Sequence, residues 1–269
     1  AISGVINIIL KKGGNKPINV SGLIGGGSNN TFNGNTAITG KKDKIDYNVN
    51  YSYANTTGIN EATSASATFD KDGYTQQSFN AGIGVQVSKN LRLSPYVRVA
   101  RINGDIDQGA FVDELDYTYS QKSVQAGIKN EFSFGKNKLN VIYNYNTINR
   151  VYVDDSVKSR NGFDIYSKGK YTGNEHFIDA YAHIELKPSV KLTVGADYRK
   201  SVSDQDYFST GIYGPYATKY AKDSLKQSQA GLYAAVNISA IKNFNMEIGN
   251  RLNIHSTYGS YDVFNINPS

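Results

Sequence analysis

Residues Thr75 to Ser88 read TQQSFNAGIGVQVS, and this stretch decides the fold class of the chain. From Phe79 to Val87 every second residue is apolar, and the residues between them are Asn, Gly and Gln. Successive side chains of a β-strand point to opposite faces of the sheet, so this segment has one apolar face and one polar face. The stretch therefore predicts a strand that separates an apolar environment from a polar one.

The same alternation returns along the rest of the chain. It is clear in Lys191 to Lys200, in Ser228 to Ala240 and in Asn245 to His255. Asn130 and Asn250 each interrupt an otherwise apolar face. These repeated segments of period two, together with 21 Tyr and 26 Gly residues, predict an all-β chain.

The connections between these segments alternate in length. Five short connections recur about every 47 to 53 residues, at 41–44, 88–90, 135–138, 187–190 and 240–243. Four longer polar stretches separate them, at 56–74, 103–115, 154–170 and 203–224. Because antiparallel strands alternate in direction, this order predicts that the short turns share one rim of the sheet and the long loops share the other.

This asymmetry is typical of outer-membrane β-barrels, which have short turns on one side of the membrane and long loops on the other. We therefore predict an antiparallel transmembrane β-barrel with about twelve strands, beginning at Pro17 and ending with Ser260 to Pro268. Strands of about 12 to 18 residues suit a tilted span. Tyrosines near the strand ends predict aromatic girdles at the membrane interfaces: Tyr47, Tyr51, Tyr53, Tyr143, Tyr145 and Tyr198.

The composition narrows the function classes. The chain of 269 residues has no Cys, which excludes disulfides, thiolate catalysis and cysteine metal sites. The mean hydropathy is −0.46 and the longest apolar run, Val5 to Leu10, contains an Asn, so the sequence excludes a membrane-spanning helix. The net charge is +6, but Lys and Arg never form a run longer than two residues, so no nucleic-acid partner is predicted.

The first residues, AISGVINIILKKG (Ala1 to Gly13), combine a β-branched run with a Lys-Gly end, which alone predicts an ordinary strand. The string also resembles the closing segment of the plug domain of TonB-dependent outer-membrane transporters. It departs from that pattern at Ser3 and at Leu10, where Thr is commoner. The plug-end motif that carries the resemblance consists of Ala1, Ile2, Gly4, Val5, Ile6, Asn7, Ile8 and Ile9.

A second segment supports the same resemblance. Gly249 to Ser260 (GNRLNIHSTYGS) is similar to a barrel segment of these receptors, especially those similar to vitamin B12 transporters. The resemblance implies 22 strands around a plug, so about twelve strands would be part of a barrel. Residues 1–14 would then be the end of the plug domain, and residues 15–269 the N-terminal part of the transmembrane β-barrel.

The resemblance also implies a function. A receptor of this family would lie in the lipid of the bacterial outer membrane and take up a scarce ligand, either vitamin B12 or an iron-siderophore complex. A TonB-type inner-membrane complex would supply the energy through a segment that is not in this chain. We expect neither an enzyme nor a catalytic cofactor.

The sequence offers little for catalysis. His176 and His183 fall on opposite faces of one predicted strand, so they cannot share a metal without a bulge. His255, Ser256 and Asp262 form a catalytic triad only on paper, because any chain rich in Ser and Asp offers such a set.

The acidic residues of the long loops are candidates for structural calcium, because carboxylate oxygens are the ligands that Ca²⁺ prefers. Some vitamin B12 transporters order their outer loops with calcium, so the resemblance implies that calcium could order the outer loops of this chain. The alternative is solvated loop charge. The main candidates are Asp105, Asp107, Asp113, Glu114 and Asp116, and Asp154-Asp155 and Asp204 with Asp206 are further acidic pairs.

Two further groups of residues are candidates for contacts. Aromatic residues in the loop 203–224 would form an adaptable ligand surface or pack on one another: Tyr207, Phe208, Tyr213, Tyr216 and Tyr220. Arginines on the polar face would contact the plug or an anionic siderophore, or pair within the barrel: Arg92, Arg98, Arg199 and Arg251.

Two other classes of protein remain open from the sequence. A passive porin or structural barrel would share the alternation and the loop asymmetry, and only the plug-end motif separates it from a receptor. A soluble β-rich binding or adhesion protein would share the strand content.

Overall fold

The computed structural model describes residues 16–62, 70–109, 111, 113–155, 164–222, 224–241 and 244–269. The plug-end motif and the rest of the predicted domain 1–14 lie outside these ranges. In the described part, the chain forms thirteen strands. They are β1 (Asn19–Gly27), β2 (Thr31–Lys42), β3 (Ile45–Ile59), β4 (Asp72–Gln86), β5 (Leu91–Asp105), β6 (Tyr117–Phe134), β7 (Asn137–Asp154), β8 (Asp164–Lys187), β9 (Val190–Gly211), β10 (Gly214–Tyr220), β11 (Lys226–Ile241), β12 (Phe244–His255) and β13 (Gly259–Pro268).

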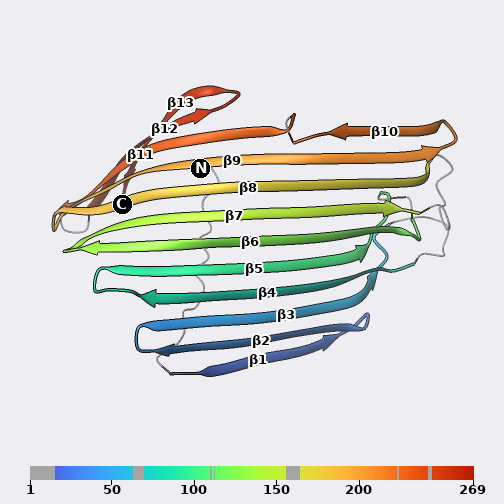
Figure 1. Cartoon of the computed structure of the whole chain (residues 1–269), viewed down its shortest axis with the longest axis horizontal. Helices are drawn as coiled ribbons and strands as arrows, with labels where there is room; N and C mark the ends of the chain where they lie inside the picture. The colour runs from blue at the N-terminus through green and yellow to red at the C-terminus, as the bar shows by residue number, and fades with distance from the viewer. Residues whose placement is uncertain are drawn as a thin grey trace.

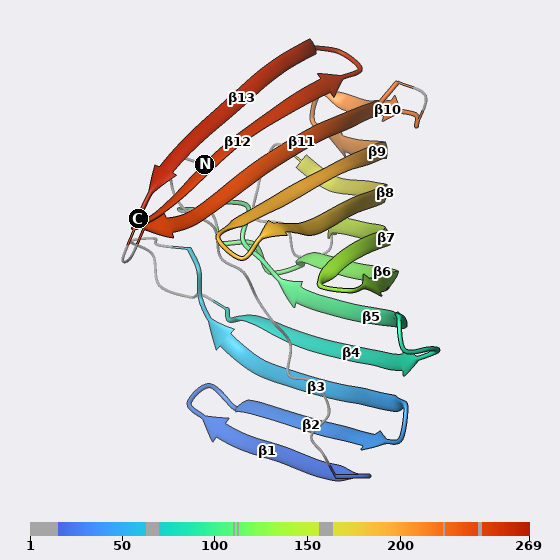
Figure 2. The same ribbon diagram turned by 90° about the vertical axis from the view of Figure 1, so that its left-hand side faces the viewer.

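All thirteen strands belong to one antiparallel sheet (Figure 1). Each strand pairs with its neighbour in the sequence, except that β11 pairs with β9 and β10 pairs with β9 beyond the end of β11. The sheet curves into an open trough, with β1 and β13 at its two free edges (Figure 2). The predicted all-β class and the antiparallel order, as part of a barrel wall, are confirmed.

The connections sort by rim as the sequence predicts. The short turns after β2, β4, β6 and β8 lie at one end of the strands, and the longer connections after β3, β5 and β7 lie at the other (Figure 1). We call these ends the short-turn rim and the long-loop rim. The tight turn between β1 and β2 also lies at the long-loop rim, and its Asn29 and Asn30 have positive φ angles of 56° and 51°. Asn tolerates this left-handed conformation better than most residues.

The stretch 203–224 differs from the prediction of a long loop. β9 continues to Gly211, and β10 returns from Gly214 to Tyr220 as its hairpin partner. The tip requires a positive φ angle, which is 86° at Gly214. The end of β9 pairs with β8 on one side and with β10 on the other, so the sheet extends beyond the neighbouring strands at this rim. This hairpin also raises the strand count from about twelve to thirteen.

The two faces of the trough have opposite chemistry. On the concave face, side chains reach across an intervening strand, as the ion pair between Arg92 of β5 and Asp46 of β3 shows. The convex face carries the apolar positions, among them Phe79, Ile83 and Leu232, which are 41%, 49% and 54% exposed. Among the described residues, Ala62 is the one buried hydrophobic residue. The apolar side chains of this sheet therefore face outward and do not form an internal core.

The alternation places all six predicted girdle tyrosines on the convex face. Tyr51 pairs with Phe79, and Tyr143 pairs with Ile178, which in turn pairs with Tyr198. No helix in the described ranges is long and apolar enough to cross a membrane.

Glycines on the concave face make room for large side chains of neighbouring strands. A Cβ atom on Gly195 of β9 would lie 2.6 Å from the ring of Tyr233 and 2.7 Å from the Cβ of Tyr181. The hydroxyl of Tyr233 crosses this glycine and donates a hydrogen bond of 2.8 Å to Asp179 Oδ1. The absence of a side chain at Gly195 therefore allows strands β8 and β11 to be linked across β9.

We predict that Gly195→Ala will displace Tyr233 and weaken its hydrogen bond to Asp179. Crowding of this kind costs about 1 to 3 kcal/mol of the free energy of unfolding. The measurement is the denaturation midpoint of the intact protein, followed by far-UV circular dichroism. Gly26→Ala is the matched control, because the nearest atom to its new Cβ would be 3.7 Å away. Equal midpoints for both variants would contradict the prediction.

Candidate functional site

A row of polar side chains crosses the concave face midway along β7, β8 and β9 and reaches the start of β11. Asn146, Glu175, Ser201 and Gln227 are successive pairing partners on β7, β8, β9 and β11. The Glu175 carboxylate is the centre of the row, because Ser201 Oγ donates to its Oε2 at 3.1 Å and Asn146 Nδ2 donates to its Oε1 at 3.4 Å. Arg199 Nε lies 3.6 Å from the same Oε2 atom.

This row forms the floor of a hollow of about 620 Å³. A hollow of that size accommodates a small organic ligand. His255 and Tyr258 come from the end of β12 and the turn that follows it, and their rings lie 4.7 Å apart. The backbone N–H groups of Thr257 and Tyr258 donate to His255 Nδ1 at 3.1 and 3.3 Å, which fixes the turn. The lining also includes Ile148, Val202, Ser203 and Leu225, so the hollow offers both apolar and polar contacts.

The four candidate arginines all lie on the concave face, and each contacts a partner. Arg251 Nη2 donates a hydrogen bond of 3.0 Å to Asp197 Oδ1, and its guanidinium lies over the ring of Tyr233. Arg98 Nε donates to Asn80 Oδ1 at 2.6 Å. Arg92 pairs with Asp46, and Arg199 combines its contact with Glu175 with a position over the ring of Phe177. Of these four, Arg199 contacts a residue that lines the hollow, Glu175. A contact with plug or ligand stays a prediction for all four.

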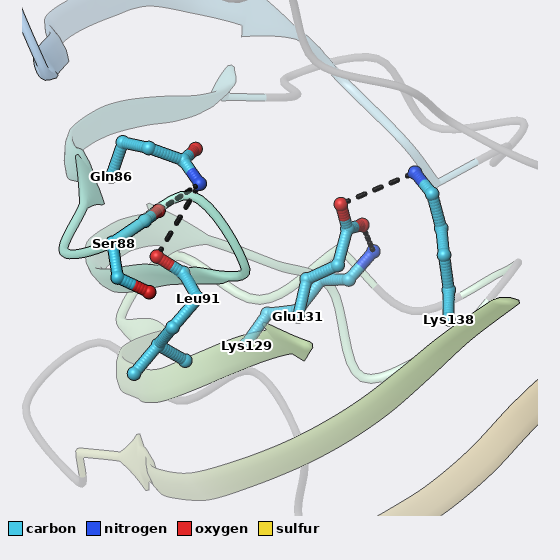
Figure 3. A network of polar contacts seen from close by, with 6 residues as sticks. All are labelled: Gln86, Ser88, Leu91, Lys129, Glu131 and Lys138. Carbon is cyan, nitrogen blue, oxygen red and sulfur yellow. Dashed lines mark hydrogen bonds and ion pairs between the residues drawn. The ribbon is translucent and has the colours of Figure 1, made fainter. Parts of the chain in front are cut away.

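Polar contacts also continue to the short-turn rim (Figure 3). Glu131 accepts a hydrogen bond of 3.3 Å from Lys138 Nζ, and Lys129 Nζ lies 3.9 Å from it. Gln86 Nε2 donates to the backbone oxygen atoms of Ser88 and Leu91, which fixes the turn between β4 and β5. The concave face therefore carries hydrogen-bonded polar groups from one rim to the other.

The five candidate aromatics lie on a β-hairpin and do not form one surface. Tyr216 pairs with Ser209 and Tyr220 pairs with Gln205, so both lie on the same face as Tyr207. The rings of Tyr207 and Tyr216 are 6.3 Å apart. Phe208 is on the opposite face, 6.2 Å from Tyr166, and Tyr213 is 85% exposed at the tip. The structure therefore brings three of the five together on one face.

The acidic residues at the long-loop rim form two clusters. Asp70, which precedes β4, joins Asp107 and Asp113, which follow β5. In a second cluster, Glu114 and Asp116 join Asp154, the last residue of β7. In each cluster the three carboxylates offer oxygen atoms within 4.8 Å of one another. Asp105 belongs to neither cluster.

The buried oxygens of the first cluster fit a cation. Asp70 Oδ1 and Asp107 Oδ2 are buried and accept no hydrogen bond from any described residue, and the same is true of Oδ1 of the neighbouring Asp72. A calcium ion lies about 2.4 Å from each oxygen that binds it, so two oxygens on opposite sides of the ion are about 4.8 Å apart. The oxygens of the cluster lie within that distance of one another. All the donors are carboxylates, which suit a hard cation.

The electrostatics of this rim agree with that geometry. Burial is the main cause that raises the pKa of Asp70, and the carboxylates of Asp113 and Asp107 raise it further. Burial raises the pKa of Asp72 to about 6, and burial also raises the pKa of Asp105. The folded state therefore holds the Asp72 proton more tightly than the unfolded chain does. The contribution of Asp72 to the free energy of unfolding therefore falls as the pH rises from about 4 to about 6, unless a bound cation favours the charged carboxylate.

The histidines do not form a catalytic site. His176 Nδ1 shares a hydrogen bond of 2.8 Å with the hydroxyl of Tyr143, and His183 Nδ1 shares one of 2.9 Å with Thr193 Oγ1. Asp262 pairs with Leu252, whose side chain is on the convex face, whereas His255 is on the concave face. The triad of His255, Ser256 and Asp262 therefore does not assemble.

Sequence reasoning missed Glu175 and Asp70. Alternation places Glu175 on the polar face, but its alignment with Ser201 and Gln227 depends on the register of three strand pairs. Asp70 is distant in sequence from Asp107 and Asp113, and the only available signal was its position in a connection at the same rim.

The fold is that of part of an outer-membrane receptor barrel. The chain superimposes on the ferric enterobactin receptor PfeA of Pseudomonas aeruginosa with a TM-score of 0.74 at 12% identity, covering 98% of this chain and 43% of that one. For the siderophore receptor PirA of Acinetobacter baumannii the TM-score is 0.66 at 14% identity, with 96% and 41% covered. For the ferripyoverdine receptor of the outer membrane of Pseudomonas aeruginosa it is 0.67 at 10% identity, with 96% and 39% covered.

The chain thus spans about two fifths of the length of these receptors. It matches no protein-family model and no curated protein sequence. The structural likeness confirms the predicted fold, a section of a receptor barrel wall. The three proteins above are receptors, and a further structural match is a copper transporter.

We predict that Ca²⁺ stabilises the long-loop rim of the intact protein. An ion that binds only the folded state, at 100 times its Kd, adds about 2.7 kcal/mol to the free energy of unfolding of the part it orders. The measurement is amide hydrogen exchange in the segment 105–116, with Ca²⁺ and with a chelator. Asp107→Asn should abolish the difference. Asp204→Asn, outside both clusters, should preserve the difference between exchange with Ca²⁺ and with chelator. If Ca²⁺ does not change the exchange rate in the parent protein, the prediction is wrong.

Proposed function

We propose that this chain is part of a TonB-dependent receptor of the bacterial outer membrane, which takes up an iron-siderophore complex or vitamin B12. The observation that carries the proposal is the two-faced sheet, with an apolar convex face, a hydrogen-bonded polar concave face, and the longer connections gathered at one rim. In an outer-membrane barrel these are the lipid face, the lumen and the extracellular side. The fold shared with the siderophore receptors supports the same assignment.

The dimensions of the convex face support a membrane location. On β5 the convex positions are apolar from Leu91 to Val99, and Arg101 follows them. The eight steps between these nine residues, at the usual rise and tilt, span about 20 Å along the membrane normal, close to the apolar band of about 25 Å in such barrels. Tyr51, Tyr145 and Tyr198 lie near the outer edge of this band, where amphipathic rings are favoured.

The concave face supports binding and transport without bond chemistry. The hollow around Glu175 lies midway along β7 to β9 and extends to the turn after β12, so a ligand that enters from the long-loop rim would reach it within the lumen. Its mixed lining would hold a partly apolar ligand that carries hydrogen-bonding groups. A plug would close the lumen below, with the arginines of the concave face as its candidate contacts. The energy-transducing complex would act on that plug from the inner membrane.

Calcium is part of the proposal for the extracellular rim. Asp70, Asp107 and Asp113 would hold one ion, and Glu114, Asp116 and Asp154 would hold a second. The connection between β5 and β6 contributes to both clusters. The ions would therefore tie together the connections that follow β3, β5 and β7, which would order the entrance to the barrel.

We predict that uptake by cells expressing the full-length protein depends on energy. Cells should accumulate radiolabelled ferric siderophore or cyanocobalamin with saturable kinetics. Accumulation should stop when the proton-motive force is collapsed or the TonB-type complex is inactivated, while ligand still binds to the cell surface.

A passive porin gives a different result. Its flux would be non-saturable, would continue without the proton-motive force, and would admit small sugars. That outcome would contradict the proposed receptor and support a passive porin. Recovery of the intact protein as a monodisperse soluble monomer without detergent would instead support a soluble binding protein.

A further inference from the structure

Two cations lie side by side on the convex face, where the apolar band ends. Arg101 of β5 and Lys122 of β6 are direct cross-strand partners, and both side chains are exposed. Like charges directly opposite each other on adjacent strands are destabilising. Neither side chain forms an ion pair or hydrogen bond with any residue in the described ranges, so the pair has no compensating anion within this part of the chain.

The pair borders a hollow of about 470 Å³ on the convex side. Tyr51, Phe79 and Val99 line it on the side of the apolar band, on the three adjacent strands β3, β4 and β5. Gln77 and Asn149 continue the polar row on either side of the two cations, as partners of Arg101 and Lys122 respectively. The hollow therefore combines a cationic and polar upper part with an aromatic and aliphatic lower part.

Further basic residues lie on the convex face of β8 and β9. Lys200 is exposed on the same convex face of β9, directly after Tyr198 on that face, and Lys170 is exposed farther from the apolar band on β8. Asp206 is the cross-strand partner of Lys170 and lies 3.8 Å from Lys219, and Asp204 lies on the same face of β9. The strip on β5 and β6 carries Arg101 and Lys122 with no acidic residue between them and the apolar band.

The ligand that matches this arrangement carries phosphate at one end and acyl chains at the other. At the membrane position assigned above, the cations lie at the level of the head groups of the outer leaflet, and the apolar part of the hollow lies at the level of the chains. Arg and Lys bind phosphate through charge-assisted hydrogen bonds, and their attraction to anionic head groups is worth about 1 kcal/mol each.

We propose that Arg101 and Lys122 form a binding site for a phosphorylated lipid of the outer leaflet, with its acyl chains over Phe79 and Val99. The inference rests on the proposed membrane location, but it concerns the outside of the barrel wall and not the transported ligand. The bound lipid would remove the repulsion between the two cations and strengthen the β5–β6 pair at the rim that carries the acidic clusters.

The test is a titration of the detergent-solubilised full-length protein with fluorescent bisphosphorylated lipid A. We expect saturable binding, and an increase in Kd of about thirtyfold in the double variant Arg101→Gln/Lys122→Gln. Lys187→Gln/Lys191→Gln removes the same charge at the short-turn rim and should leave the Kd unchanged. Far-UV circular dichroism checks that both variants are folded.

Two further arms identify the ligand group. Dephosphorylated lipid A should bind as weakly as bisphosphorylated lipid A binds to the Arg101 and Lys122 variant, and millimolar inorganic phosphate alone should not displace the lipid. Equal affinities of the parent protein and the double variant would show that Arg101 and Lys122 do not form the site. Displacement by free phosphate would show that the site binds phosphate and not the lipid. A photo-cross-linking amino acid in place of Gln77 should cross-link to lipid in cells, which does not depend on detergent.

The proposed function has a separate readout. Cell fractionation shows whether the parent protein is in the outer membrane, and the uptake assay shows whether it transports. A protein that fractionates and transports as proposed, but binds lipid A equally well without Arg101 and Lys122, would overturn this inference alone. A protein found outside the outer membrane would overturn the proposed function, whatever the titration gives.

Discussion

The backbone pairing of consecutive antiparallel strands is the constraint on which the rest of this structure depends. Each strand satisfies its N–H and C=O groups with its neighbours, so the sheet does not need a buried core to hold its polar backbone. The side chains are then free to divide into an apolar and a polar face. This division explains why large apolar residues such as Ile83 and Leu232 are exposed on the convex side, which an ordinary soluble protein would avoid.

The polar face is held together by contacts that skip a strand. Tyr233 reaches from β11 to Asp179 on β8, and Arg251 reaches from β12 to Asp197 on β9. Such contacts form only where the sheet curves, because curvature brings side chains of alternate strands together on the concave side. They also need gaps in the intervening strand, which Gly195 provides beneath Tyr233. Curvature, small residues and long polar side chains therefore support one another.

The two rims differ in chemistry as well as in length. The short-turn rim carries simple charge pairs, such as Lys138 with Glu131, that remain close to solvent. Exposed pairs of this kind contribute little to stability. The long-loop rim buries carboxylates against one another, which is costly unless a cation or a proton compensates the charge. Arg101 and Lys122 of the convex face lie towards the same rim, whereas the hollow around Glu175 lies midway along β7 to β9.

The sequence by itself determined the strand content, the two faces and the division of the connections between rims, because a period of two and the length of a connection are local properties. It could not determine that 203–224 continues as a hairpin, since that depends on the partner edge that β9 offers. Only the tertiary structure aligned Glu175 with Ser201 and brought Asp70 to Asp107, because register and curvature, and not neighbouring residues, decide which distant side chains meet.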